Sequence, residues 1–168
     1  MALAKAGSTV VAPDLPGWGE TAQFPGGKPF GPDWKEAALS LHLARPLLGR
    51  RVAILLEAIG REGATRIIGI GAAGPAVLHA AFLHGKLEDV VLEDALVSWA
   101  SVLSMPATED QYSNALPGAL RCYDLPDLAP PRLTIRRARD AAGRPVSQAE
   151  LEALYPPAPG RVLEAGKP

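Results

Sequence analysis

The residues whose types and spacing most clearly indicate a functional site lie at positions 67–81, which read IIGIGAAGPAVLHAA. A short apolar run of strand-forming isoleucines leads into Gly69, Gly71 and Gly74, and an apolar helical pattern follows at once. A strand that turns abruptly into a helix gathers backbone N–H groups and the positive end of the helix dipole at one point. Such a corner can hold a phosphate or stabilise a developing oxyanion, and two kinds of site are built in this way.

The first interpretation is a dinucleotide-binding turn. Residues 69–74 read G-x-G-x-x-G between a predicted strand and a predicted helix, where the glycines would let the backbone approach a pyrophosphate. Asp94 ends the next predicted strand, 20 residues after Gly74, where an acid would meet a ribose hydroxyl. The fingerprint normally opens the first strand–helix–strand unit, whereas here another predicted strand and a long helix precede it. Nucleotide binding through Gly69, Gly71, Gly74 and Asp94 therefore stays open as an alternative.

The second interpretation comes from a resemblance that runs through nearly the whole chain. Residues 10–20, VVAPDLPGWGE, are similar to the strand and loop VVAPDLPGxGES of the α/β-hydrolase superfamily, and residues 67–81 are similar to its nucleophile elbow, VVGHSMGGAVALHAA. Three later segments resemble the family's next strand, its acid-bearing segment and its last strand: 89–94, 131–147 and 160–167. The runs ALPGAL and YDLP within residues 115–126 also resemble the second, hydrolase-like half of bacterial proteins related to acetyl xylan esterases.

This resemblance implies a site whose decisive positions have changed. Carried over position by position, the nucleophile falls on Gly71, which has no side chain to attack a carbonyl. The acid falls on Asp140, and the histidine falls on or near Lys167, whose amine is a poor general base at neutral pH. The backbone N–H of Ala72 would still supply half of an oxyanion hole. The resemblance therefore implies an esterase-related domain without ordinary serine-hydrolase activity.

Other groups near the predicted strand ends keep different outcomes open. Asp140 lies among four arginines, so we expect its carboxylate to form an ion pair, and we expect Asp94 to anchor a loop. If either acid instead activates water, the chain would be an ester or lactone hydrolase with an atypical site. Trp18 lies in a glycine-rich loop, where it either lines a pocket or packs beneath the loop. His79 and His84 are five residues apart on one predicted helix, and we expect both at its surface.

Five predicted strands, with helices between them, must position these groups. The strands are expected at residues 8–14, 65–70, 89–93, 131–136 and 161–164, and the helices at residues 34–43, 52–59, 75–84, 96–103 and 148–154. Asp33 and Glu36 have the spacing of a helix capping box, as do Ser147 and Glu150. Strands that alternate with helices predict parallel pairing and helices on both faces of the sheet. We therefore expect a three-layer α/β/α fold with a mostly parallel sheet of about five strands.

By the same resemblance, residues 1–168 form a single α/β-hydrolase-like domain, a partial core that lacks the family's first three strands. The third of these strands normally lies between the two strands that correspond to residues 8–14 and 65–70. Either these two segments pair directly or another polypeptide fills the slot, because an unfilled slot exposes two unpaired strand edges. The partners implied are a second hydrolase domain or a second copy of the chain.

The composition limits the remaining classes of function. The 168 residues carry a formal net charge of −1, which gives no electrostatic case for binding nucleic acid. We expect no membrane segment, because no apolar run approaches the ~20 residues needed to cross a bilayer, and no secretory signal. Cys122 is the only cysteine, which excludes an internal disulfide and a zinc site built from several cysteines. We also expect no metal and no cofactor. The lack of a predicted signal peptide or membrane segment is compatible with the cytoplasm but does not fix the compartment.

Overall fold

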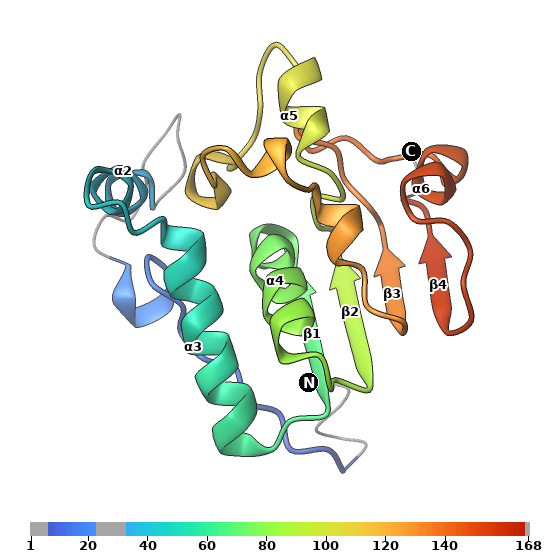
Figure 1. Cartoon of the computed structure of the whole chain (residues 1–168), viewed down its shortest axis with the longest axis horizontal. Helices are drawn as coiled ribbons and strands as arrows, with labels where there is room; N and C mark the ends of the chain where they lie inside the picture. The colour runs from blue at the N-terminus through green and yellow to red at the C-terminus, as the bar shows by residue number, and fades with distance from the viewer. Residues whose placement is uncertain (1–6, 23–32, 167–168) are drawn as a thin grey trace.

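A four-stranded parallel sheet is the central element of the computed structural model, which describes residues 7–22 and 33–166 (Figure 1). Its strands lie side by side in chain order: β1 (Arg66–Ile70), β2 (Asp89–Glu93), β3 (Leu133–Arg136) and β4 (Arg161–Glu164). All three neighbouring pairs are parallel. The sequence predicted each of these strands, and the predicted bounds of β2 and β4 are those of the structure.

Residues 8–14, predicted as a buried strand, form no strand. Val10 and Val11 are 55% and 47% exposed, so the prediction that this segment is buried was also wrong. Its β-branched residues favour an extended backbone, but a strand also needs to lie in hydrogen-bonding register beside another strand, and this segment does not lie so beside β1. β1 is therefore an edge strand within the described residues. Residues 8–14 do not pair with it directly, which was one of the two arrangements that we considered.

The described residues form five α-helices. These are α2 (Trp34–His42), α3 (Leu47–Glu62), α4 (Gly74–His84), α5 (Ala100–Ser104) and α6 (Gln148–Leu154). The helix α4 connects β1 to β2 and packs on both, α3 packs on α4, and α5 lies beyond the carboxyl ends of the strands (Figure 1). We expected helices on both faces of the sheet, whereas these helices lie over one face or beyond the strand ends.

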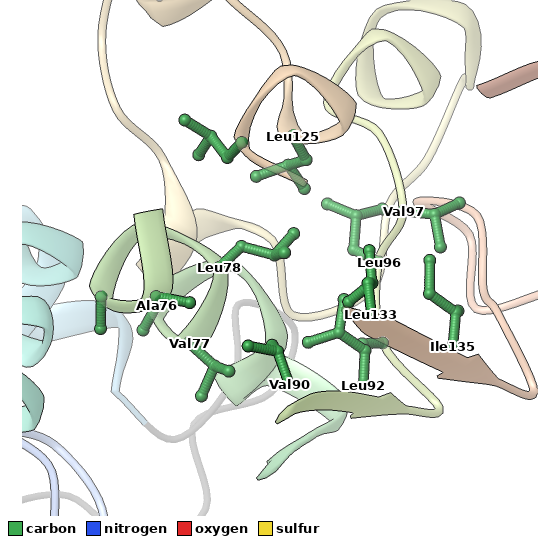
Figure 2. Close-up of a cluster of buried hydrophobic side chains, with 14 of the residues drawn as sticks. Ala76, Val77, Leu78, Val90, Leu92, Leu96, Val97, Leu125, Leu133 and Ile135 are labelled. Carbon is green, nitrogen blue, oxygen red and sulfur yellow. The ribbon is translucent and has the colours of Figure 1, made fainter. Parts of the chain in front are cut away.

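The hydrophobic core lies between this face of the sheet and α4 (Figure 2). Val90 and Leu92 project from β2 toward Val77 and the other buried residues of α4, whereas Ile135 of β3 lies beside Val97. The helix α4 is apolar on nearly every side rather than along one stripe, so it can be buried from Gly74 to Ala81. Its histidine at position 79 is only 9% exposed, so the prediction that this side chain lies at the surface was wrong.

The two predicted capping boxes have different outcomes. At the start of α6, the side chains of Ser147 and Glu150 accept each other's backbone N–H groups, as predicted. At the start of α2, Asp33 occupies the N-cap position but its side chain caps no backbone group. The Asp33 carboxylate instead forms a buried ion pair with Arg51 of α3, and this tertiary contact replaces the local one.

Candidate functional site

The predicted strand-to-helix corner is present where β1 ends. The chain leaves Ile70 through a short 3-10 turn, Gly71–Ala73, and enters α4 at Gly74. Gly71 has a φ of +57°, in the left-handed region that costs a residue with a side chain roughly 1–2 kcal/mol. A Cβ atom at Gly71 would meet no atom within 4 Å, so this position faces open space.

The other two glycines of the motif are explained by close packing. A Cβ atom on Gly69 would lie 3.0 Å from the Val77 Cβ, and one on Gly74 would lie 2.5 Å from the Ala95 Cβ. β1, α4 and the residue that follows Asp94 therefore approach more closely than side chains at these positions would allow. The G-x-G-x-x-G spacing thus has a structural cause that requires no bound phosphate.

Asn114 supports the corner, and sequence analysis did not identify it. Its side chain is buried, and its Nδ2 donates to the Ala72 carbonyl oxygen at 3.0 Å. The Oδ1 atom of the same amide is buried without a hydrogen-bond partner. Position 114 lies in an irregular stretch between β2 and β3, 42 residues from Ala72, so no local spacing could have predicted the contact.

A cleft of about 280 Å³ opens where the strands end, and four of the predicted site residues line it. Gly71 and Ala72 contribute from the corner, Asp94 from the end of β2, and Asp140 from the loop after β3. The carboxyl ends of parallel strands share one edge of the sheet, which is why residues distant in the chain meet here. Lys167 lies outside the described residues.

Asp94 is held by two arginines. Arg137 donates to its Oδ2 from Nε at 2.9 Å and from Nη2 at 2.7 Å, and Arg139 donates to its Oδ1 from Nη2 at 2.9 Å. The hydrogen bond from Arg137 is the main reason that the pKa of Asp94 lies below its ordinary value. Since both carboxylate oxygens are engaged, Asp94 anchors the loop, which is the expected use of this residue.

Asp140 organises the turn that follows it. Its Oδ1 accepts from the backbone N–H groups of Ala142 and Arg144, and its Oδ2 accepts from Arg144 Nε, each at 2.9 Å. Burial by itself would raise the pKa of Asp140, but the hydrogen bonds from Arg144 and Ala142 outweigh it and lower the pKa. The ion pair expected from the sequence is therefore present, and it makes this carboxylate a weak base.

Trp18 does not line the cleft. Its Nε1 donates to Asp33 at 3.1 Å, and the Arg51 guanidinium stacks 3.8 Å from the centre of its indole ring. Arg51 is fully buried and also donates to the Pro16 carbonyl oxygen at 3.1 Å. Burial is the largest influence on the pKa of Arg51 and lowers it, while Asp33 opposes that effect. Trp18 thus packs beneath its loop, beside Arg51 and Asp33.

The described histidines form no hydrogen bond with a serine. The Nδ1–H of His79 donates to the Pro75 carbonyl oxygen at 2.6 Å, so its Nε2 accepts from the Tyr123 hydroxyl at 2.8 Å. Burial lowers the pKa of His79. Ser98 donates its hydroxyl hydrogen to Asp124, which also accepts backbone N–H groups at the start of a 3-10 turn. The polar groups of this region therefore hold the loops together.

Two further kinds of site are absent from the part of the chain that the structure describes. None of its helices has the length and apolar character required to span a bilayer. No three histidine, cysteine, aspartate or glutamate side chains of residues 7–22 and 33–166 gather as ligands for a metal ion.

Comparisons of the chain with protein-family models, with curated proteins and with solved structures found no match. The likeness to the α/β-hydrolase superfamily therefore rests on the sequence segments described above. The structure establishes that the chain has an α/β fold with a four-stranded parallel sheet in the order β1-β2-β3-β4.

Proposed function

We propose that this chain is an α/β-hydrolase-like, esterase-related domain that keeps the corner of a nucleophile elbow without its nucleophile, and that it acts by binding. The observation that carries the proposal is Gly71, with a φ of +57° at the strand-to-helix corner and open space in its Cβ direction. In α/β-hydrolases a strained turn of this kind lifts a serine hydroxyl clear of the sheet. A glycine at that point cannot form an acyl-enzyme.

The groups around Gly71 favour binding over catalysis. Asp94 and Asp140 are each paired with arginine and have lowered pKa values, so both are ionised at neutral pH and are poor proton acceptors. The cleft that they line has the volume of a site for a small polar ligand. Backbone N–H groups at the corner and the Arg139 guanidinium in the lining of the cleft supply hydrogen-bond donors for such a ligand.

We also propose that a partner strand pairs with the open edge of β1. The edge leaves backbone groups of Arg66–Ile70 without a neighbouring strand in the described residues. A strand from a second hydrolase domain, or from a second copy of the chain, would pair with these groups and protect the edge.

Ester turnover tests the proposal. The wild-type chain, Asp140→Ala and Glu152→Ala are compared for hydrolysis of p-nitrophenyl acetate, with Glu152 as an exposed carboxylate outside the cleft. We expect all three to match the rate of buffer alone. Turnover that Asp140→Ala abolishes and Glu152→Ala retains would instead assign water activation to Asp140, and the chain would be an ester or lactone hydrolase.

Nucleotide binding is a second candidate, because Asp94 lines the same cleft as Gly71 and Ala72. Titration with NAD or FAD, followed by tryptophan fluorescence, tests this candidate. Our proposal predicts no saturable quenching, since the arginines already engage both oxygens of Asp94. Saturable quenching that is lost in both Gly71→Val and Asp94→Asn would replace the proposal with dinucleotide binding.

A further inference from the structure

The face of the sheet opposite the helices carries an ordered pattern of side chains. Strand register places one residue from each strand in a central row: Ile68, Val91, Thr134 and Val162. Because side chains alternate along a strand, residues two positions away from this row point to the same face. We call these ten residues the back face: Arg66, Ile68, Ile70, Asp89, Val91, Glu93, Thr134, Arg136, Val162 and Glu164.

The back face is separate from the hydrophobic core. The core cluster takes Val90 and Leu92 from β2 but not Val91, which lies between them and points to the other side. At the two ends of the central row, Ile68 is 36% exposed and Val162 is 46% exposed, while Val91 in its middle is buried. Figure 1 shows α4 over the face that carries the core.

Charged rows flank the central row. On one side Arg66 forms an ion pair with Asp89, its register partner, at 2.9 Å. On the other side, the charges alternate in sign across three strands, at Glu93, Arg136 and Glu164. The Arg136 Nε and the Glu164 Oε2 are 3.4 Å apart. An apolar centre with a charged border is the composition of a protein–protein interface rather than of a face that binds a polyanion.

We propose that the back face packs against the back face of a second copy of the chain. The two-fold axis runs parallel to the strands, between β2 and β3. Rotation about this axis keeps each row and reverses the order of the strands. Ile68 then meets Val162 of the second copy, and Glu93 meets its Arg136, whereas Val91 is already buried within its own chain and adds no contact. Each of these contacts occurs twice, so two ion pairs lie along one side of the apolar row.

The charges favour this axis over the other two-fold arrangement of the same faces. An axis across the strands would keep the strand order and exchange the rows. It would place Asp89 opposite Glu93 of the second copy, twice, and like charges in opposition are unfavourable. The chosen axis also keeps the strand directions of the two sheets aligned, which is a common geometry for packed sheets.

The size of the face determines how strong the association is. Four strands spaced about 4.8 Å apart, each rising about 3.3 Å per residue, give a face of roughly 19 by 17 Å. This small area belongs to weak, concentration-dependent interfaces. The inference does not rest on the proposed function, because it concerns the back face and not the cleft.

Sedimentation velocity of the full chain, from micromolar to near-millimolar concentration, tests the inference. We expect the wild-type chain to shift from monomer toward dimer as concentration rises. Val162→Lys places an ammonium in the apolar row, opposite Ile68 of the second copy, and is expected to weaken the dimer by roughly tenfold or more. Leu103→Lys is the matched control, because Leu103 is 78% exposed on α5, away from the back face, and this variant should dimerise like wild type.

Charge reversal identifies the axis. Glu93→Arg and Arg136→Glu each oppose like charges across the proposed interface and should weaken the dimer, whereas an equimolar mixture of the two single variants should restore it, because opposite charges then meet across the interface. A monomer at every concentration would overturn the inference, as would a dimer that Val162→Lys leaves unchanged. A mixture that dimerises no more strongly than either single variant would overturn the axis. If the charge variants do not fold, Val162→Lys alone decides, because its position is an exposed one on an edge strand.

Discussion

At the scale of single residues, the three glycines of the corner differ in what a side chain would meet. Gly71 has a left-handed φ and open space around its Cβ direction, whereas Gly74 has an ordinary helical φ and no room beside Ala95. The first is a question of backbone strain and the second a question of packing. Their variants therefore separate two explanations of the same sequence motif.

Alanine substitutions test this difference. Gly71→Ala should lower the free energy of unfolding by about 1–2 kcal/mol through backbone strain, and Gly74→Ala by about 3 kcal/mol or more through overpacking. Gly60→Ala, in the interior of α3 with no atom within 4 Å of a Cβ, should raise it by about 1 kcal/mol. Urea denaturation measures all three. A Gly74→Ala variant as stable as wild type would contradict the packing explanation.

His79 gives a prediction about pH. Its pKa is lowered in the folded chain by burial, so below about pH 6.5 the unfolded chain takes up a proton that the folded chain does not. Stability should therefore fall as the pH decreases from about 7.5 to 5, by up to about 1.4 kcal/mol per pH unit. Asp94 and Asp140, whose pKa values are lowered, add little above pH 5 because they remain ionised there.

Two histidine variants check this dependence by urea denaturation at several pH values. His79→Leu should be less stable than wild type at about pH 7.5, because Tyr123 and Pro75 lose a partner, but its stability should change less toward about pH 5. His42→Gln, at an exposed position, should keep the dependence of wild type. An unchanged slope in His79→Leu would show that other groups cause it.

At the scale of elements, the buried ion pair between Asp33 and Arg51 joins the start of α2 to α3. Arg51 has no solvent exposure, and its guanidinium also contacts Trp18 and the Pro16 carbonyl. One arginine thus joins Pro16, Trp18 and the start of α2 to α3. The stability of this cluster depends on the Asp33 carboxylate, because a buried Arg51 cation without a partner would be strongly unfavourable.

Asp33→Ala removes the carboxylate that pairs with Arg51. It should lower the free energy of unfolding by about 3–5 kcal/mol, as measured by urea denaturation. Adding Arg51→Met should recover part of the loss, since the uncompensated charge disappears. Glu36→Ala, which removes the partner of the half-exposed Arg50, is the control and should cost less than about 1 kcal/mol. A loss of similar size in both single variants would contradict the importance of burial.

The sequence predicted those elements whose signals are local. The β-branched run of β2, the capping box of Ser147 and the glycine corner are each specified within a few residues, and the structure has them where we expected. The segment 8–14 has an equally clear strand pattern, but whether it pairs depends on a neighbour that its own residues do not specify. Asn114 and Arg51 act through contacts 42 and 35 residues distant, which no spacing rule could predict.

At the scale of the whole molecule, the parallel order of the strands explains why the predicted site residues gather. Four strands in chain order bring the corner after β1, the acid after β2 and the loop after β3 to one edge. The same sheet has helices on one face only in the described residues, which leaves the back face with its apolar row. We therefore propose ligand binding at the cleft and self-association through the back face.

The central claim, that the corner at Gly71 works without a nucleophile, is tested most directly by a fluorophosphonate probe, which reacts covalently with activated serines. The full chain is incubated with the probe, and its intact mass is measured. We expect an unchanged mass, because no serine of the described residues donates a hydrogen bond to a histidine. A mass increase of one phosphonyl group, mapped to a serine, would contradict the account.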